Sequence, residues 1–385
     1  MNLPTSTNTT RSAYRCVCGS PIFFRNSQCL SCGRALAYEP GSARMVALQV
    51  SGAQQLNAWL IEGDSNGQRY ARCGNFKRAA GCNWLVALHA PLGSEHDEAL
   101  CIACSLNRTI PDQSLPENEL LWARIESAKR RLVSQLLGLG LPVQARKRNP
   151  QPGDPMGLAF DFLREWPGQS VTTGHASGVI TVNVQEADDA ERERIRAALH
   201  EPYRTLLGHL RHEVGHYYWE RLVLHSEWLL PFRALFGDER TDYSAALHQH
   251  YTHGARPDWH QHHVSQYASS HPWEDWAETW AHYLHLRDAL GSAQSFGFTG
   301  DDVEWHAQPF GPSALWDAQR AGSADYLKLI NDWLRMTSVL NELSDSMGQA
   351  PFYPFALSAP VVAKLQFVHE LIVQAATSRS DLHSV

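Results

Sequence analysis

The chain has 385 residues, 43% of them hydrophobic, and a formal net charge of −7 at neutral pH. This size and composition support two or three compact units with a sizeable core. The acidic balance argues against sequence-independent nucleic-acid binding, and no apolar run of 18 residues is present to cross a membrane. Residues 1–14 are polar and lack the apolar stretch of a secretory signal, so we expect a cytoplasmic protein.

All eight cysteines lie within the first 110 residues, which we expect to form a zinc-ribbon region of short strands and loops. The first four have the spacing of two zinc knuckles, C-x-C and C-x-x-C, on either side of a short segment. The C-x-C knuckle is one residue shorter than usual. The pattern predicts a structural zinc site, whose ligands would be Cys16, Cys18, Cys29 and Cys32.

The second group of four cysteines predicts another structural zinc site. Its C-x-x-C pair, Cys101 and Cys104, again resembles a knuckle, whereas eight residues separate Cys73 from Cys82. Disulfides are the alternative, because the number of cysteines is even. A reducing cytoplasm favours metal binding over disulfides.

Residues 111–149 are expected to connect this region to the rest of the chain. A polar, proline-bearing segment is followed by a predicted helix over residues 119–139. Glu126 can pair with Arg130 one turn further along that helix. The apolar stripe of the helix consists of Leu121, Ile125, Leu132 and Leu136.

Residues 150–385 are expected to form the largest unit. Residues 179–184 are rich in β-branched side chains and alternate in polarity, which predicts a strand. Two interpretations of this strand remain open. It is either an edge strand that pairs with an extended substrate backbone or an ordinary interior strand.

Residues His212 to His216 form an H-E-x-x-H motif within a predicted helix over residues 203–223. The two histidines are four residues apart, so both imidazoles lie on one helix face and can bind one metal ion. Glu213 follows the first histidine, where its carboxylate can hold and deprotonate a metal-activated water. Gly215 weakens the helix, which indicates close packing or room near a substrate.

A third ligand is expected from the predicted helix that follows Pro272. Glu274 and Glu278 are four residues apart and share one face of that helix. One carboxylate can bind the metal while the other accepts the free N–H of a ligating histidine. We assign Glu274 as the ligand and Glu278 as the partner of the histidine. A solvated acidic helix face is the alternative.

Several other residues near the motif are weaker candidates. His209, one turn before His212, is expected to be packed or hydrogen-bonded. A tyrosine or a histidine of this region could stabilise the oxyanion of a reaction intermediate. The rival ligands are His248, His250, His253, His260, His262, His263, His271, Asp238, Glu239 and Asp242, and the candidate tyrosines are Tyr243, Tyr251 and Tyr267.

Over nearly its whole length the chain resembles bacterial zinc-binding metallopeptidases that carry an N-terminal zinc-ribbon region. Four strings carry the resemblance: E-P-Y-R-T-L-L-G-H at 201–209, R-H-E-V-G-H-Y-Y-W at 211–219, F-G-D-E-R at 236–240 and H-P-W-E-D-W-A-E-T at 271–279. The family resembles gluzincins, whose zinc is held by the two histidines of H-E-x-x-H and a later glutamate. The resemblance implies that the zinc ligands are His212, His216 and Glu274 and that the general base is Glu213.

The sequence therefore predicts an α+β protein, in which a zinc-ribbon-like β region precedes a mostly helical, zincin-like metallopeptidase domain with a small sheet. The expected function is hydrolysis of peptide bonds in a peptide or protein substrate, with one catalytic and two structural zinc ions. The alternative is a catalytically inactive zincin scaffold whose zinc-ribbon region docks a protein or, less readily, a nucleic-acid partner. The intact Glu213 favours the enzyme, because a metal scaffold does not need that carboxylate.

Overall fold

The computed structural model describes residues 12–50, 58–88, 99–149, 151, 154–199, 201–304 and 309–382. The chain divides into two compact units. Unit 1 is Met1–Gly138 with Pro142–Ala197, and unit 2 is Leu139–Leu141 with Ala198–Val385. This division differs from the boundaries expected after residues 110 and 149, which stay predictions. None of the helices in the described ranges is long and apolar enough to cross a membrane.

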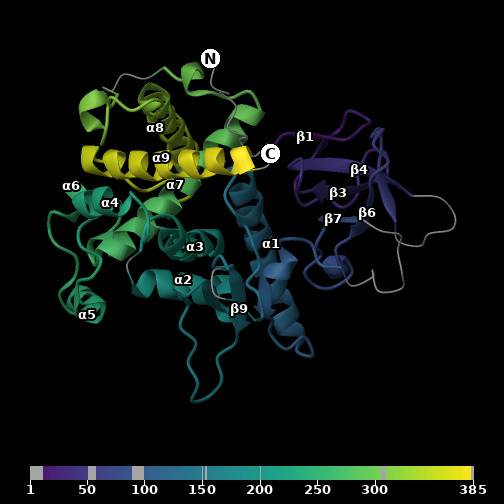
Figure 1. Ribbon diagram of the computed structural model, residues 1–385, viewed down its shortest axis with the longest axis horizontal. Coiled ribbons are helices and arrows are strands. Elements are labelled where there is room, and N and C mark those ends of the chain that lie inside the picture. The colour runs from purple at the N-terminus through teal and green to yellow at the C-terminus, as the bar shows by residue number, and fades with distance from the viewer. Residues whose placement is uncertain are drawn as a thin grey trace. The chain divides into compact units, whose positions relative to one another are not determined.

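Unit 1 begins with antiparallel β-structure, coloured purple to blue in Figure 1. A short hairpin of β1 and β2 precedes a five-stranded sheet in the order β3-β4-β5-β6-β7. Alternate side chains of this sheet form a buried apolar cluster, which includes Ala37, Leu48, Tyr70 and Leu85. The strands are β1 (Tyr14–Arg15), β2 (Pro21–Ile22), β3 (Ala35–Glu39), β4 (Arg44–Val50), β5 (Trp59–Ile61), β6 (Arg69–Arg72) and β7 (Leu85–Leu88).

The long helix α1 (Pro116–Gly138) follows the cysteine-rich part of unit 1. It confirms the helix expected over residues 119–139. The predicted stripe is buried along its whole length, at Leu121, Ile125, Leu132 and Leu136. Glu126 lies 3.9 Å from Arg130 but only 2.7 Å from Lys129, so its closest basic partner is three residues away rather than four.

A four-stranded mixed sheet completes unit 1, in the order β10-β11-β9-β8. Strand β11 pairs with β9 in parallel and with β10 in antiparallel orientation, so it is an interior strand. The interpretation of this segment as an edge strand for substrate is therefore wrong, because its backbone is already paired on both sides. The elements are η1 (Gly74–Phe76), η3 (Cys104–Leu106), β8 (Asn107–Thr109), β9 (Ala159–Leu163), β10 (Gly174–Ala176), β11 (Val179–Asn183), η4 (Val184–Ala187) and α2 (Asp189–Ala198).

The regular elements in the described residues of unit 2 are all helices, joined by loops. Helix α7 is its central element and packs against α3, α4, α8 and α9 (Figure 1). The α-helices are α3 (Leu206–Leu222), α4 (Leu229–Phe236), α5 (Tyr243–His253), α6 (Trp259–His262), α7 (Pro272–Ser295), α8 (Ser323–Ser346) and α9 (Ala359–Leu382). Short 3₁₀ turns are η5 (Tyr267–Ser269), η6 (Gly300–Asp302) and η7 (Pro312–Ala314). The predicted α+β class is confirmed, with the small sheet in unit 1.

Close contact between α3 and α7 explains the glycine inside the H-E-x-x-H motif. A Cβ atom on Gly215 would lie 3.1 Å from Ala277 Cα and 3.2 Å from Trp280 Cδ1. The indole N–H of Trp276 also donates a hydrogen bond of 2.8 Å to the Gly215 carbonyl. The missing side chain therefore lets the two helices that carry the motif residues approach each other closely.

Candidate metal centre

Helix α3 carries the H-E-x-x-H motif in its buried middle turns. The helix begins at Leu206 rather than at residue 203, because the side chain of Thr205 caps it by accepting a 3.0 Å hydrogen bond from the Gly208 N–H. His212 and His216 are buried and their rings lie 5.0 Å apart between centroids. The helical spacing therefore brings both imidazoles to the same side of α3, as the sequence predicts.

Helix α7 brings Glu274 to these rings from sixty residues further along the chain. Glu274 Oε2 lies 3.0 Å from His212 Nε2 and 3.7 Å from His216 Nε2. Potential ligand atoms of the three residues all lie within 4.8 Å of one another, and all three side chains are buried. The helix start is fixed by His271, whose Nδ1 accepts a 3.1 Å hydrogen bond from the Trp273 N–H, followed by Pro272 in the first turn.

Glu278 lies one turn after Glu274, on the other nitrogen of the first histidine. Its Oε1 is 2.8 Å from His212 Nδ1. Its Oε2 accepts a hydrogen bond of 2.7 Å from the Ser265 hydroxyl. This contact fixes the imidazole so that Nε2 faces His216 and Glu274, which is the arrangement that supports a metal-ligating histidine.

The charges of this cluster are strongly coupled. Burial lowers the pKa of His212, but the hydrogen bonds to Glu274 and Glu278 outweigh it and hold this pKa well above its usual range. Burial raises the pKa of both acids, yet His212 lowers that of Glu278 to about 2 and that of Glu274 well below its usual value. The two carboxylates therefore stabilise positive charge at the imidazole rings. A divalent cation bound between these side chains would be stabilised by the same negative charges.

Glu213 lies next to His212 in α3 and is buried, with 5% of the residue exposed. Among the described residues no group donates a hydrogen bond to its Oε2. His209 Nε2, one turn earlier on α3, is 4.0 Å from Glu213 Oε1. A buried carboxylate oxygen without a donor is costly, so it indicates a place for a polar molecule such as water.

Aromatic side chains surround the cluster. The Tyr243 hydroxyl donates a 2.7 Å hydrogen bond to Glu274 Oε1, and burial next to this carboxylate raises the pKa of Tyr243, so the phenol keeps its proton. The Trp273 ring lies 4.0 Å from the His216 ring, and the Tyr267 ring 5.9 Å from that of His212. Of the candidate tyrosines, Tyr243 donates a hydrogen bond to a predicted ligand, whereas Tyr267 contacts one through its ring.

Most of the rival ligands lie in other environments, and His250 packs against Tyr267 with 5.9 Å between the ring centroids. His248, His253, His260 and His262 are exposed. His263 Nδ1 lies 3.3 Å from Asp275, and the His271 side chain caps α7. The three acids have local partners, since Asp238 pairs with Arg240, Glu239 with Arg233, and Asp242 caps α5.

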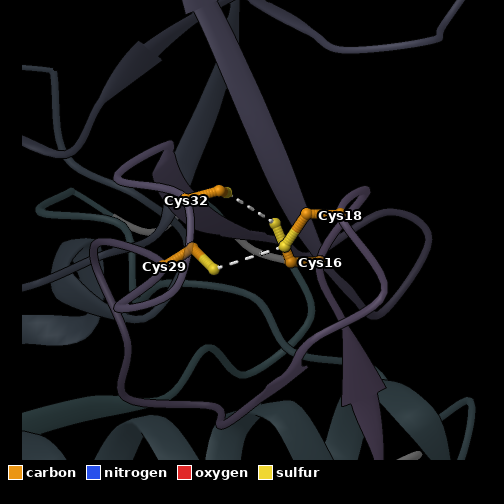
Figure 2. Close-up of side chains that lie close together, drawn as sticks. All are labelled: Cys16, Cys18, Cys29 and Cys32. Atoms are coloured by element: carbon orange, nitrogen blue, oxygen red, sulfur yellow. Dashed lines mark hydrogen bonds between the residues drawn. The ribbon is translucent and has the colours of Figure 1, made fainter.

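The four cysteines of the first group converge from two loops, as Figure 2 shows. The sulfurs of Cys16 and Cys32 are 3.7 Å apart, and those of Cys18 and Cys29 are 3.8 Å apart. Hydrogen bonds from the side chain and backbone of Ser20 lower the pKa of Cys18 to about 6. All four residues are free thiols that meet at one point, which suits a four-thiolate metal site.

The second group of cysteines also converges, and it is fully buried. The sulfurs of Cys82 and Cys101 are 3.7 Å apart, and the Cys101 N–H donates to Cys73 Sγ over 3.4 Å. Cys104 Sγ lies 3.8 Å from Glu126 Oε2 on α1. The chain between Cys73 and Cys82 turns back at η1, where the Asn75 carbonyl accepts a 3.1 Å hydrogen bond from the Cys82 N–H, so the loose spacing still brings the four sulfurs together.

All three clusters fit zinc by their donor atoms. Four thiolates form a closed structural site, whereas two imidazoles and one carboxylate leave a position open. Ser265 and Trp273 are contacts that the sequence did not reveal. Ser265 lies in a loop, so no periodic spacing connects it to Glu278. Trp273 sits within a tryptophan-rich segment in which several rings are ordinary core.

The chain is similar to a known protein family and to several bacterial relatives. Residues 118–371 match the family described as "Putative zinc-binding metallo-peptidase", and residues 13–115 match a zinc-ribbon domain. One uncharacterized protein of Mycobacterium bovis and two of Mycobacterium tuberculosis are each 40% identical over 368 residues, which cover 95% of this chain and 96% of each relative. No solved structure matches the chain. The chain therefore belongs to this zinc-binding metallopeptidase family and carries a zinc-ribbon domain ahead of the family's matched region.

Proposed function

We propose that the protein is a zinc-dependent hydrolase that cleaves peptide bonds in a peptide or protein substrate. His212, His216 and Glu274 would hold the catalytic ion, and the two cysteine clusters would hold structural ions. The observation that carries the proposal is the buried convergence of these three side chains, with ligand atoms within 4.8 Å, beside a carboxylate oxygen that has no hydrogen-bond donor among the described residues.

A zinc ion bound there supplies Lewis-acid polarisation of the scissile carbonyl and makes water more acidic. The chain supplies the proton transfers. Glu213 would accept a proton from the attacking water through Oε2, which has no hydrogen-bond donor among the described residues, and would then return it to the leaving amine. Glu278 keeps the His212 ring oriented during both transfers, because it holds Nδ1.

Two variants and a metal measurement test this function. Elemental analysis of the purified wild type should find three zinc ions per chain, and His212→Ala should contain two. Glu213→Gln should still contain three zinc ions but lose hydrolysis of a diverse peptide library that the wild type cleaves. Glu227→Gln, an exposed acid outside the cluster, is the matched control and should keep both zinc content and hydrolysis.

The alternative scaffold function predicts a different pattern. A wild type that binds three zinc ions but cleaves no peptide in such a library would contradict the hydrolase proposal. The zinc-ribbon region would then be the part to test for a protein partner. Full activity in Glu213→Gln would contradict the role of Glu213 while leaving the metal ligands standing.

A further inference from the structure

Glu274 has two carboxylate oxygens, and the structure uses them differently. Oε2 faces both histidines, at 3.0 Å from His212 Nε2 and 3.7 Å from His216 Nε2. Oε1 instead accepts the 2.7 Å hydrogen bond from the Tyr243 hydroxyl. One oxygen is therefore directed towards the metal position, while the other is occupied by a protein donor.

We propose that Tyr243 is a positioning residue that restricts Glu274 to single-oxygen coordination of the catalytic ion, an inference that rests on the proposed function. A carboxylate can bind a metal through one or both oxygens. Two-oxygen binding would take up the position that a catalytic zinc site keeps open for water or substrate. A hydrogen bond to Oε1 opposes this, because that oxygen would have to leave its donor to reach the ion.

The surroundings of Tyr243 hold its ring in place for this role. Tyr243 is the first residue of α5, whose start is fixed by Asp242 accepting a 3.0 Å hydrogen bond from the Ala245 N–H. The ring lies 5.2 Å from the ring of His271 and 6.0 Å from that of Trp273. His271 caps α7 and Trp273 lies in its first turn, which also carries Glu274, so the donor and its acceptor are fixed against the same end of this helix.

This role differs from that of an oxyanion donor. A phenol has a single O–H, and here that proton is directed at Glu274 Oε1. Serving the oxyanion would require the hydroxyl to leave the carboxylate. The two roles have different consequences for metal binding, because only a positioning residue changes the affinity and ligand geometry of the ion before any substrate is present.

The test compares Tyr243→Phe with Ser244→Ala in the full chain. Both changes remove one hydroxyl from the start of α5, and Ser244 is exposed. The affinity of the third zinc ion is measured by competition with a chelator, with His212→Ala as the two-ion baseline. The third site is also loaded with Co²⁺, whose visible spectrum reports the number and type of its ligands.

Tyr243→Phe should weaken binding of the third zinc ion by about 10- to 100-fold and alter the cobalt spectrum, whereas Ser244→Ala should change neither. The phenyl ring keeps the contacts with His271 and Trp273, so the helix content should remain that of the wild type. Unchanged affinity and spectrum in Tyr243→Phe would overturn the positioning role alone. A wild type with only two zinc ions would overturn the proposed function as well, while weakened zinc binding without any peptidase activity would refute only hydrolysis.

Discussion

Gly215 on α3 lies directly against Trp280 on α7, where a Cβ atom would be 3.2 Å from the indole Cδ1 and 3.3 Å from the Trp280 Cβ. Both distances are shorter than ordinary van der Waals contact, and Ala277 Cα is closer still. The glycine within the metal motif is thus a packing residue between the helix that carries the histidines and the helix that carries Glu274.

Gly215→Ala should therefore destabilise unit 2, although alanine is the better helix former. The extra methyl group pushes α3 away from α7, at a cost of about 1–3 kcal/mol for overpacking. It should also weaken binding of the third zinc ion, because the histidines and Glu274 would move apart. Urea unfolding and zinc competition measure the two effects.

Gly311→Ala is the matched control for this change. Gly311 has no atom within 4 Å of an added Cβ and has an ordinary backbone conformation. Its substitution should leave both stability and zinc affinity close to those of the wild type. Equal stability of Gly215→Ala and Gly311→Ala would show that the helix contact does not need the glycine.

Glu278→Gln should weaken binding of the third zinc ion without removing a proposed metal ligand. The amide can still accept from His212 Nδ1, but it lacks the negative charge that makes the ring a stronger donor to the metal. We expect a loss of affinity of about 10-fold or more, and a smaller loss for Ser265→Ala, which frees Glu278 Oε2. Ser295→Ala, at the far end of α7, should bind zinc like the wild type, and the same affinity in Glu278→Gln would refute this supporting role.

Much of the candidate site could be predicted because helical periodicity is visible in a sequence. His212 and His216 are four residues apart on α3, and Glu274 and Glu278 are four apart on α7, so each pair is restricted to one helix face. The packing of α3 against α7 is a long-range contact, and the residue spacing within either helix does not predict it. The paired acids after Pro272 suggested Glu274 as the third ligand, and the family resemblance implied the same residue.

Other features depended on pairing that local sequence does not specify. The segment around β11 reads as a strand, yet its place inside the sheet depends on β9 and β10 and could not be deduced from alternation alone. The contact of Ser265 with Glu278 joins a loop to a helix and has no pattern of its own. The Lys129 side chain on α1 is fully buried beside Glu126, although a lysine outside the apolar stripe is ordinarily solvated.

Lys129→Met should strongly destabilise unit 1. The Lys129 ammonium donates to Glu126 Oε1 over 2.7 Å and also contacts Asn107, and both charged side chains have no exposed surface. Removing the lysine leaves a buried carboxylate without its nearest counter-charge, since Arg130 lies 3.9 Å away, and such a loss costs about 3–5 kcal/mol. Urea unfolding of the zinc-loaded protein measures the change.

The double variant Lys129→Met with Glu126→Gln separates the charge from the packing. It removes both charges while keeping similar volumes, so it should recover a large part of the stability lost in the single variant. A double variant as unstable as Lys129→Met would mean that the buried pair contributes through shape alone.

Removal of zinc should act on the two units differently. The cysteine-rich part of unit 1 brings its chain segments together at two four-cysteine clusters, whereas unit 2 has an aromatic core between α3, α7 and α9 that needs no metal. A strong chelator should therefore make residues 12–50 susceptible to a protease such as trypsin while the helical circular dichroism of unit 2 persists. Cys29→Ser should reproduce this selective cleavage with zinc present, because it removes one ligand of the first cluster, and His212→Ala should not. If chelation instead melted the helices together with the ribbon region, or left Cys29→Ser as resistant as the wild type, the first cluster would not be the element that holds this part of the chain folded.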